Sequence, residues 1–137
     1  MIKILIVDDS LPFRESLKAF LAAHPEIEVV GETEDGLTAL SKAKELRPDI
    51  VLMDVNMEGM DGFSATERLK EELPDIGVII LSMYDLEQYR EAAEAKGASA
   101  YVTKRALVGG LLSAIRQAVR ASKSIRRRTN SRRRSSS

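Results

Sequence analysis

Short apolar segments alternate along the chain with longer stretches in which apolar residues recur at helical spacing. An apolar run of about five residues followed by ten or more amphipathic residues is typical of a strand–helix unit. The predicted strands are Ile2–Val7, Ile27–Val30, Ile50–Met53, Val78–Leu81 and Ala98–Val102. Their repeated alternation with helices predicts an α/β fold built on a parallel sheet.

The five predicted strands differ in how apolar they are. The first, third and fourth are almost continuously apolar, which a strand requires when helices cover both faces of its sheet. These three are therefore predicted to be central. Glu26–Val29 alternates charged and apolar residues and Ala98–Tyr101 is only weakly apolar, so the second and fifth strands are predicted to be edges.

Several helix boundaries are readable in the sequence. Ser10, Asp35, Asp61 and Asp85 can each cap a helix start by accepting backbone N–H bonds, and Pro12 is compatible with a first turn. Prolines or a glycine predict three helix ends, at Arg47-Pro48, Leu73-Pro74 and Gly97. An apolar stripe predicts the last helix, with members Val108, Leu111, Leu112, Ile115 and Val119.

The composition changes after Ser122. The last fifteen positions hold seven of the 21 basic residues, and Ile125 is their one apolar residue, whereas all 21 acidic residues lie between Asp8 and Glu94. Such a segment cannot bury enough apolar surface to offset the entropy lost on ordering. We therefore predict a folded domain over residues 1–122 and a disordered basic tail over 123–137.

The length of 137 residues and the apolar content of 44% fit one compact domain rather than a multidomain enzyme. We find neither an apolar run long enough to span a bilayer nor a signal peptide, and the chain has no cysteine. A cytoplasmic protein without a membrane partner is expected. The basic tail can bind nucleic acid or an acidic surface through salt-dependent contacts, although it lacks aromatic residues for stacking and is better explained as a solvated linker.

Polar residues follow four of the predicted strands. Asp8 and Asp9 come after the first strand, Asp54 after the third, Ser82 after the fourth and Lys104 shortly after the fifth. Because the carboxyl ends of parallel strands lie along one edge of a sheet, these side chains are expected to converge.

Three crowded carboxylates repel one another unless a cation joins them. Mg²⁺ fits best, because it takes oxygen ligands and commonly lies between carboxylates and a phosphate. A carboxylate beside Mg²⁺ can attack a phosphoryl group to form an aspartyl phosphate. Lys104 and the Ser82 hydroxyl can then contact the phosphoryl oxygens.

The chain resembles the receiver domain of two-component response regulators over residues 1 to about 121. The segments that resemble the family are Leu5–Ser10, Pro48–Met57, Gly59–Gly62, Val78–Met83 and Gly97–Lys104. The segment Ser82–Asp85 is most similar to the branch whose members usually carry a C-terminal helix-turn-helix and act in transcription.

The resemblance implies a doubly wound (βα)5 flavodoxin-like three-layer sandwich with the parallel sheet order 2-1-3-4-5. It implies that Asp54 is the phosphoacceptor and receives its phosphoryl group from a sensor histidine kinase. Asp9 would bind Mg²⁺ directly, Asp8 largely through water, and the backbone carbonyl of Asn56 would be a further ligand beside Asp54.

The resemblance also implies a switch. Ser82 and Lys104 would sense the phosphoryl group, and Tyr101 would turn inward, which changes the surface of the fourth helix, fifth strand and last helix. This surface would control a downstream output, and phosphorylation is expected to favour a homodimer. Asn56 and Tyr84 would set how fast water removes the phosphoryl group.

The sequence departs from the family pattern at a few positions. Glu58 replaces the usual proline four residues after the acceptor, and Arg105 replaces the proline that often follows the lysine. The expected output domain is also missing, which keeps open two alternatives: a single-domain phosphoryl shuttle or protein-interaction regulator, or a shortened form of a longer protein.

Other protein classes fit the sequence less well. A phosphohydrolase with an aspartyl phosphate would normally carry a second Asp at the position of Asn56, and a flavin carrier would not place Asp8 and Asp9 in its phosphate loop. A purely structural pseudo-receiver would not explain the complete set of site residues. We therefore expect a phosphorylation-controlled regulator and not an enzyme acting on a metabolite.

Overall fold

The computed structural model describes the backbone of residues 1–56 and 61–135 and the side chains of residues 1–56 and 61–122. The position of Glu58 therefore lies outside the described residues. The strands are β1 (Ile2–Val7), β2 (Ile27–Thr33), β3 (Ile50–Asp54), β4 (Gly77–Ser82) and β5 (Ala100–Thr103). The helices are α1 (Leu11–Ala22), α2 (Gly36–Leu46), α3 (Gly62–Glu72), α4 (Glu87–Ala95), the 3-10 turn η1 (Lys104–Ala106) and α5 (Leu107–Ser135).

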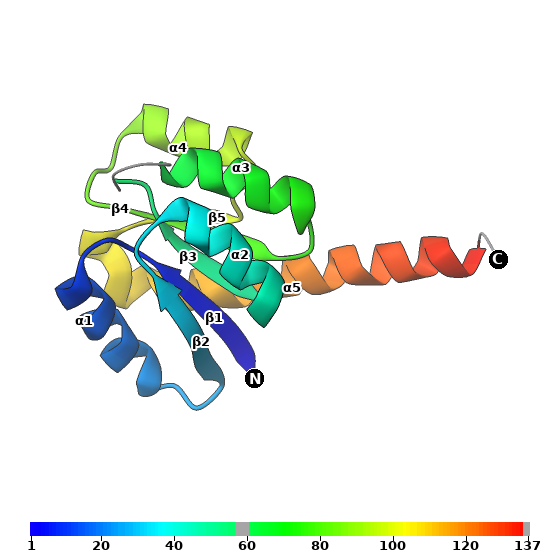
Figure 1. Cartoon of the computed structure of the whole chain (residues 1–137), viewed down its shortest axis with the longest axis horizontal. Helices are drawn as coiled ribbons and strands as arrows, with labels where there is room; N and C mark the ends of the chain where they lie inside the picture. The colour runs from blue at the N-terminus through cyan, green and yellow to red at the C-terminus, as the bar shows by residue number, and fades with distance from the viewer. Residues whose placement is uncertain (57–60, 136–137) are drawn as a thin grey trace.

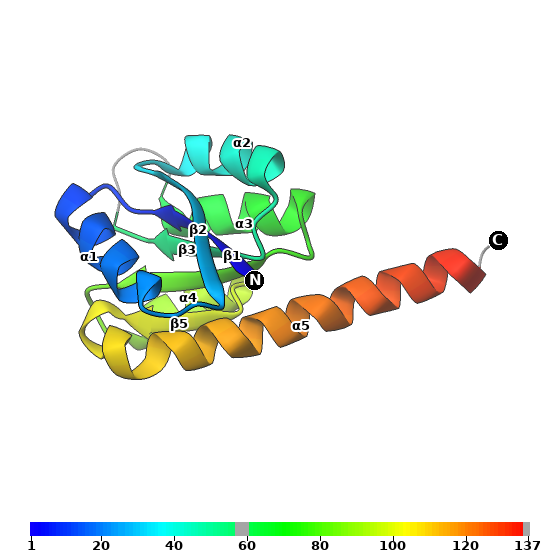
Figure 2. The same ribbon diagram turned by 90° about the horizontal axis from the view of Figure 1, so that it is seen from below.

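The strands form one parallel five-stranded sheet in the order β2-β1-β3-β4-β5. Helices α1 and α5 cover one face and α2, α3 and α4 cover the other, which gives three layers (Figure 1 and Figure 2). Each interface has its own apolar core: Leu21 and Ile115 pack in one, and Ala39 and Leu69 in the other. The predicted doubly wound fold and sheet order are confirmed.

The burial of the strands follows the apolar pattern of the sequence. All residues of β3 and β4 and the last four of β1 are buried, so the three predicted central strands are confirmed. Strand β2 is longer than predicted, because Gly31 and Glu32 pair with β1 beyond an irregularity in register. Strand β5 begins later than predicted, because the Ala98 N–H donates to the Ala93 carbonyl and so closes the end of α4.

Three of the four predicted helix caps are confirmed. Ser10, Asp35 and Asp61 each accept a backbone N–H from the residue three positions later. The prediction for Asp85 is wrong, because the cap position of α4 is the next residue, Leu86, whose side chain has no hydrogen-bonding group. Asp85 instead accepts a bond from Arg90 Nε at 2.7 Å.

The start of α3 is packed directly against the end of β3. A Cβ atom added at Gly62 would lie 2.3 Å from the backbone oxygen of Asp54. Only glycine allows this approach, because no real Cβ comes so close to a backbone atom. The glycine therefore allows the start of α3 to pack directly against the residue predicted to accept a phosphoryl group.

Helix α5 differs from the prediction in two respects. Val108 is 78% exposed, because the buried stripe runs through Leu107, Leu111 and Ile115 instead. The helix also continues to Ser135 and extends past the sheet (Figure 2), whereas residues 123–137 were predicted to be disordered. Residues 123–135 contain no proline or glycine and are rich in arginine, a good helix former, so the helix meets no breaker. No helix in the described part of the chain is both long and apolar enough to cross a bilayer.

Candidate metal and phosphoryl site

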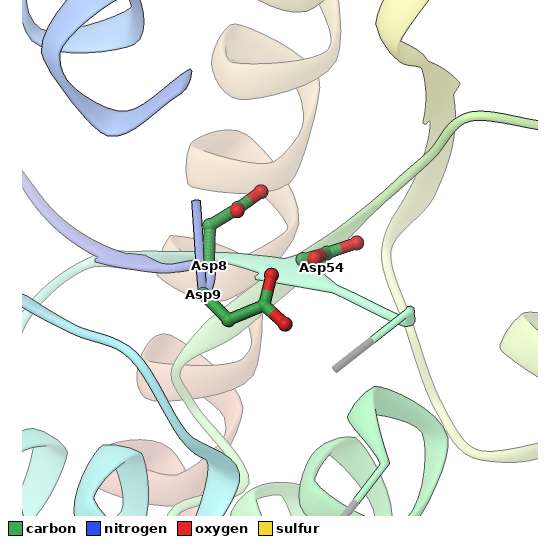
Figure 3. A group of neighbouring side chains, drawn as sticks. All are labelled: Asp8, Asp9 and Asp54. Atoms are coloured by element: carbon green, nitrogen blue, oxygen red, sulfur yellow. The ribbon is translucent and has the colours of Figure 1, made fainter. Parts of the chain in front are cut away.

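Three carboxylates meet at the carboxyl edge of the sheet. Asp8 follows β1 and Asp54 ends the neighbouring strand β3, so the sheet order brings them together with Asp9. One carboxylate oxygen from each of the three residues lies within 4.8 Å of the others. Their carboxylates project from the ends of these strands into one region (Figure 3). Asp8 and Asp54 are buried and Asp9 is exposed, so the cluster opens to solvent on the Asp9 side.

The ammonium group of Lys104 faces this cluster. Its Nζ lies 2.8 Å from Asp8 Oδ2 and 3.8 Å from Asp54 Oδ1. The ammonium group also lies over the ring of Phe13, 4.0 Å from the ring centroid, where the face of the ring attracts it. Lys104 is therefore held between both buried carboxylates.

Asp8 is strongly held by neighbouring groups. Its Oδ1 accepts the N–H of Ser10 at 2.8 Å while its Oδ2 accepts from Lys104. The main chain is fixed too, since the Asp8 N–H donates to the Thr33 carbonyl and the Asp8 carbonyl accepts from Arg14 Nη1. Asp8 is thus the best-anchored of the three acids.

The electrostatics of Asp54 favour the arrival of positive charge. Burial raises the pKa of Asp54 above its ordinary value, and the charge of Asp8 adds to this. The Asn56 N–H, which donates to Asp54 Oδ1 at 3.1 Å, and Lys104 oppose the rise without cancelling it. A divalent cation would relieve the repulsion, and a set of carboxylate oxygens fits Mg²⁺.

Ser82 and Tyr101 lie on the two strands beyond Asp54. Asp54 pairs with Leu81 in β4, and Ser82 pairs with Thr103 in β5. The buried Ser82 Oγ accepts the Tyr84 N–H at 3.1 Å, while the Tyr101 hydroxyl donates to the Tyr84 carbonyl. Tyr84 is thus bonded both to the serine and to the predicted switch residue.

The structure places Asp8, Asp9, Asp54 and Lys104 in one cluster, as the sequence predicts, and brings Ser82 to the same edge. Phe13 and Arg14 were not predicted from the sequence. An aromatic and a basic residue in the first turns of a helix are ordinary core and surface residues there, and no spacing signal marks them. The side-chain contacts of both residues reveal their place beside the cluster.

Comparison with known proteins agrees with this geometry. A family model described as the response regulator receiver domain matches residues 4–116, which is most of the chain. The chain belongs to the response regulator receiver domain family. Its predicted relationship to transcriptional response regulators is confirmed by the relatives below.

The receiver domain is similar to regulators of transcription and, over a shorter stretch, to an enzyme. It is 40% identical over 119 residues to the transcriptional regulatory protein LiaR of Bacillus subtilis, covering 86% of this chain and 56% of that protein. Over 57 residues it is 56% identical to a protein-glutamate methylesterase/protein-glutamine glutaminase of Syntrophomonas wolfei, covering 42% of this chain and 16% of that protein.

Among solved structures, a LuxR-family two-component response regulator from an Aurantimonas species superposes with a TM-score of 0.83 at 30% identity. The match covers 87% of the receiver domain and 85% of that chain. The receiver domain spans about half the length of the curated regulators it matches over most of its length.

Proposed function

We propose that this receiver domain accepts a phosphoryl group on Asp54 from a sensor histidine kinase, with Mg²⁺ as cofactor. The main support is the cluster of three carboxylates that share a 4.8 Å region with a lysine beside them. A structural role alone does not explain two buried aspartates at adjacent strand ends.

The residues present fit a bound Mg²⁺. Asp9 and Asp54 would be direct ligands, Asp8 would act largely through water because its oxygens already bind Ser10 and Lys104, and the Asn56 carbonyl would complete the protein ligands. When bound, the ion supplies positive charge that offsets repulsion between the acids and an incoming phosphoryl group.

The chain's own groups define the transfer step. A carboxylate oxygen of Asp54 attacks the phosphorus of a phosphohistidine, so a P–O bond forms as the P–N bond breaks. The electron pair goes to the imidazole nitrogen, which takes up a proton. Lys104 then has a phosphoryl oxygen as a partner in addition to Asp8, and the Ser82 hydroxyl donates to another oxygen. A small acyl phosphate can serve as donor by the same attack.

The contacts of Ser82 provide a route from the phosphoryl group to the surface. When Ser82 turns toward a phosphoryl oxygen, its Oγ loses the hydrogen bond from the Tyr84 N–H. Tyr84 then shifts, and its carbonyl loses the hydrogen bond from the Tyr101 hydroxyl. Tyr101 then turns inward and changes the surface formed by α4, β5 and α5. This is a shift between two packings of the same chain, biased by the new phosphoryl contacts.

We propose that the output is related to transcription, because the match to LiaR covers twice as much of this chain as the match to the methylesterase. On this view the receiver domain occupies residues 1–122, does not itself act on a metabolite, and works in the cytoplasm. Phosphorylation favours a homodimer, and nucleic acid binds through an output domain or the basic residues 123–137. The alternative is a single-domain phosphoryl shuttle or protein-interaction regulator.

The experiment is intact-mass spectrometry after incubation with acetyl phosphate and Mg²⁺. Wild type is expected to gain the mass of one phosphoryl group, whereas Asp54→Ala and wild type kept in a metal chelator are expected to gain none. Equal phosphorylation of wild type and Asp54→Ala would show that the acceptor is another residue.

A further inference from the structure

Arg14, on α1, links three segments of the chain beside the acid cluster. Its side chain is 11% exposed, and its Nε donates to Glu32 Oε1 on β2 at 2.9 Å. Its Nη1 donates to the backbone carbonyl of Asp8. One guanidinium group therefore connects α1 and β2 to the loop that carries two of the three acids.

The bond from Arg14 fixes a particular peptide group. The Asp8 carbonyl belongs to the peptide that joins Asp8 to Asp9, and the N–H of Asp8 on the other side donates to the Thr33 carbonyl at 3.1 Å. The main chain is thus held both before and after the Asp8 Cα. Because a rotation of this peptide would re-aim the exposed Asp9 side chain, these contacts constrain the backbone from which the Asp9 carboxylate projects.

Arg14 is itself oriented by its neighbours. Glu32 also accepts from Lys18, whose Nζ lies 2.6 Å from Oε2, so Glu32 is held by both cations. A planar guanidinium can donate to Glu32 and to the Asp8 carbonyl at the same time. A lysine at position 14 offers a point charge on a flexible stem and does not reproduce this fixed pair of bonds.

We propose that Arg14 is a positioning residue for the cation site: by fixing the Asp8–Asp9 peptide against β2, it aims the Asp9 carboxylate at the bound divalent ion. This inference rests on the proposed function, in which the acid cluster binds Mg²⁺. Residues that orient metal ligands typically change metal affinity by about 10–100-fold when they are mutated.

The test is a calorimetric titration of the full chain with MgCl₂. Arg14→Lys is expected to weaken Mg²⁺ binding about tenfold. The matched control is Lys18→Gln, which removes the other cation on Glu32 without touching the Asp8 carbonyl, and it is expected to change the affinity less than about twofold. Urea unfolding of each variant separates a loss of affinity from a loss of stability. Equal Mg²⁺ affinity in folded Arg14→Lys and wild type would overturn the inference.

A second, metal-free measurement separates this inference from the proposed function. In chelator, the amide resonances of Asp9 and Ser10 are expected to move in Arg14→Lys and to stay in place in Lys18→Gln. Unmoved resonances in Arg14→Lys would overturn the positioning role even if the protein binds Mg²⁺. Failure of wild type to bind Mg²⁺ would instead refute the proposed function, and the resonances would still decide how the peptide is held.

If Arg14→Lys does not fold, Glu32→Ala replaces it. This variant keeps Arg14 but removes the acceptor that orients its Nε, so Mg²⁺ affinity is expected to fall by less than the loss of about tenfold expected for Arg14→Lys. Wild-type affinity in a folded Glu32→Ala protein would contradict the role of the Arg14–Glu32 pair.

Discussion

Helices α3 and α4 cover the same face of the sheet but are anchored very differently. In α3, Asp61 caps the first turn by accepting the Ser64 N–H at 2.9 Å, and Gly62, Ala65, Thr66 and Leu69 are buried. In α4, the cap position is Leu86, and Ala93 is the buried residue of the helix. The two neighbouring helices therefore present a firmly packed element beside a weakly packed one.

If Asp54 accepts a phosphoryl group as proposed, this difference in packing predicts which of the two helices moves. Helix α3 is packed against the Asp54 carbonyl at Gly62, so moving it would disturb the proposed acceptor itself. Helix α4 buries Ala93 and packs the half-buried Tyr89 against Phe63 of α3. Arg90 adds exposed contacts with Asp85 and with the Tyr101 ring. Shifting α4 loses few buried contacts, and elements that move in a switch are drawn from the less stable parts of a fold.

Truncating one leucine in α3 and one at the start of α4 should reveal the largest difference in stability cost between the two helices. Leu69→Ala in α3 is expected to lower the free energy of unfolding by about 2–5 kcal/mol, because it leaves a cavity in the core. Leu86→Ala at the start of α4 is expected to cost less than about 1 kcal/mol, because Leu86 is exposed. Urea unfolding measures both values, provided that the dependence of the unfolding free energy on urea concentration is the same in the variants and wild type. Similar costs would show that α4 is as firmly packed as α3.

A methyl group added at the start of α3 should have the next largest effect. Gly62→Ala places a Cβ against the Asp54 backbone, so we expect a loss of about 1–3 kcal/mol and slower phosphorylation by acetyl phosphate. The control is Gly110→Ala in α5, where nothing lies within 4 Å of the new Cβ; it is expected to stabilise by about 1 kcal/mol and leave phosphorylation unchanged. Unchanged stability and phosphorylation in Gly62→Ala would mean that α3 is not locked onto Asp54.

Removing the side-chain cap of α3 and adding one to α4 should reduce the difference in stability between the two helices. Asp61→Ala is expected to cost about 1 kcal/mol, whereas Leu86→Asp, which supplies a cap that α4 lacks, is expected to gain about 0.5–1 kcal/mol. Amide exchange in α4 should slow in Leu86→Asp. No gain in that variant would indicate that α4 does not depend on its first turn.

The smallest effect concerns pH and the end of α3. Burial lowers the pKa of Lys70, whose Nζ donates to the Pro74 and Ile76 carbonyls, and Asp75 partly opposes the shift. Lys70 therefore loses its proton at a lower pH in the folded state than in the unfolded state. Between the lowered pKa and the ordinary value near 10.5 the unfolded chain binds more protons, so the free energy of unfolding should rise slightly with pH. Lys70→Met should remove this rise in urea unfolding measured across alkaline pH. An identical slope in wild type and Lys70→Met would assign the rise to another group.

The site was more predictable from sequence than the helices around it. Asp8, Asp54 and Lys104 each lie at or just beyond the end of a predicted strand, and a parallel sheet must bring such positions to one edge. The cap at Asp85 was mispredicted because an acid before a helix can instead pair with a nearby basic residue, here Arg90. Arg14 was missed because its importance depends on the direction of two hydrogen bonds, which no local pattern encodes.

The tail shows the limit of a composition argument. The charge and the lack of apolar residues over 123–137 predict disorder, because the segment has nothing to bury. The backbone is helical to Ser135 because a docked helix provides the costly first turns, and arginine-rich continuation then adds one hydrogen bond per residue. Composition predicts whether a segment can bury apolar surface. It does not predict whether a helix that is already formed will continue through that segment.

The central claim is that a phosphoryl group on Asp54 changes α4 and leaves α3 in place. Hydrogen–deuterium exchange of wild type and Asp54→Asn, each with Mg²⁺ and with or without acetyl phosphate, tests it directly. We predict that acetyl phosphate changes exchange across residues 87–95 of wild type alone, with residues 62–72 unaffected. The same change in Asp54→Asn, or a change in wild type confined to residues 62–72, would contradict the account.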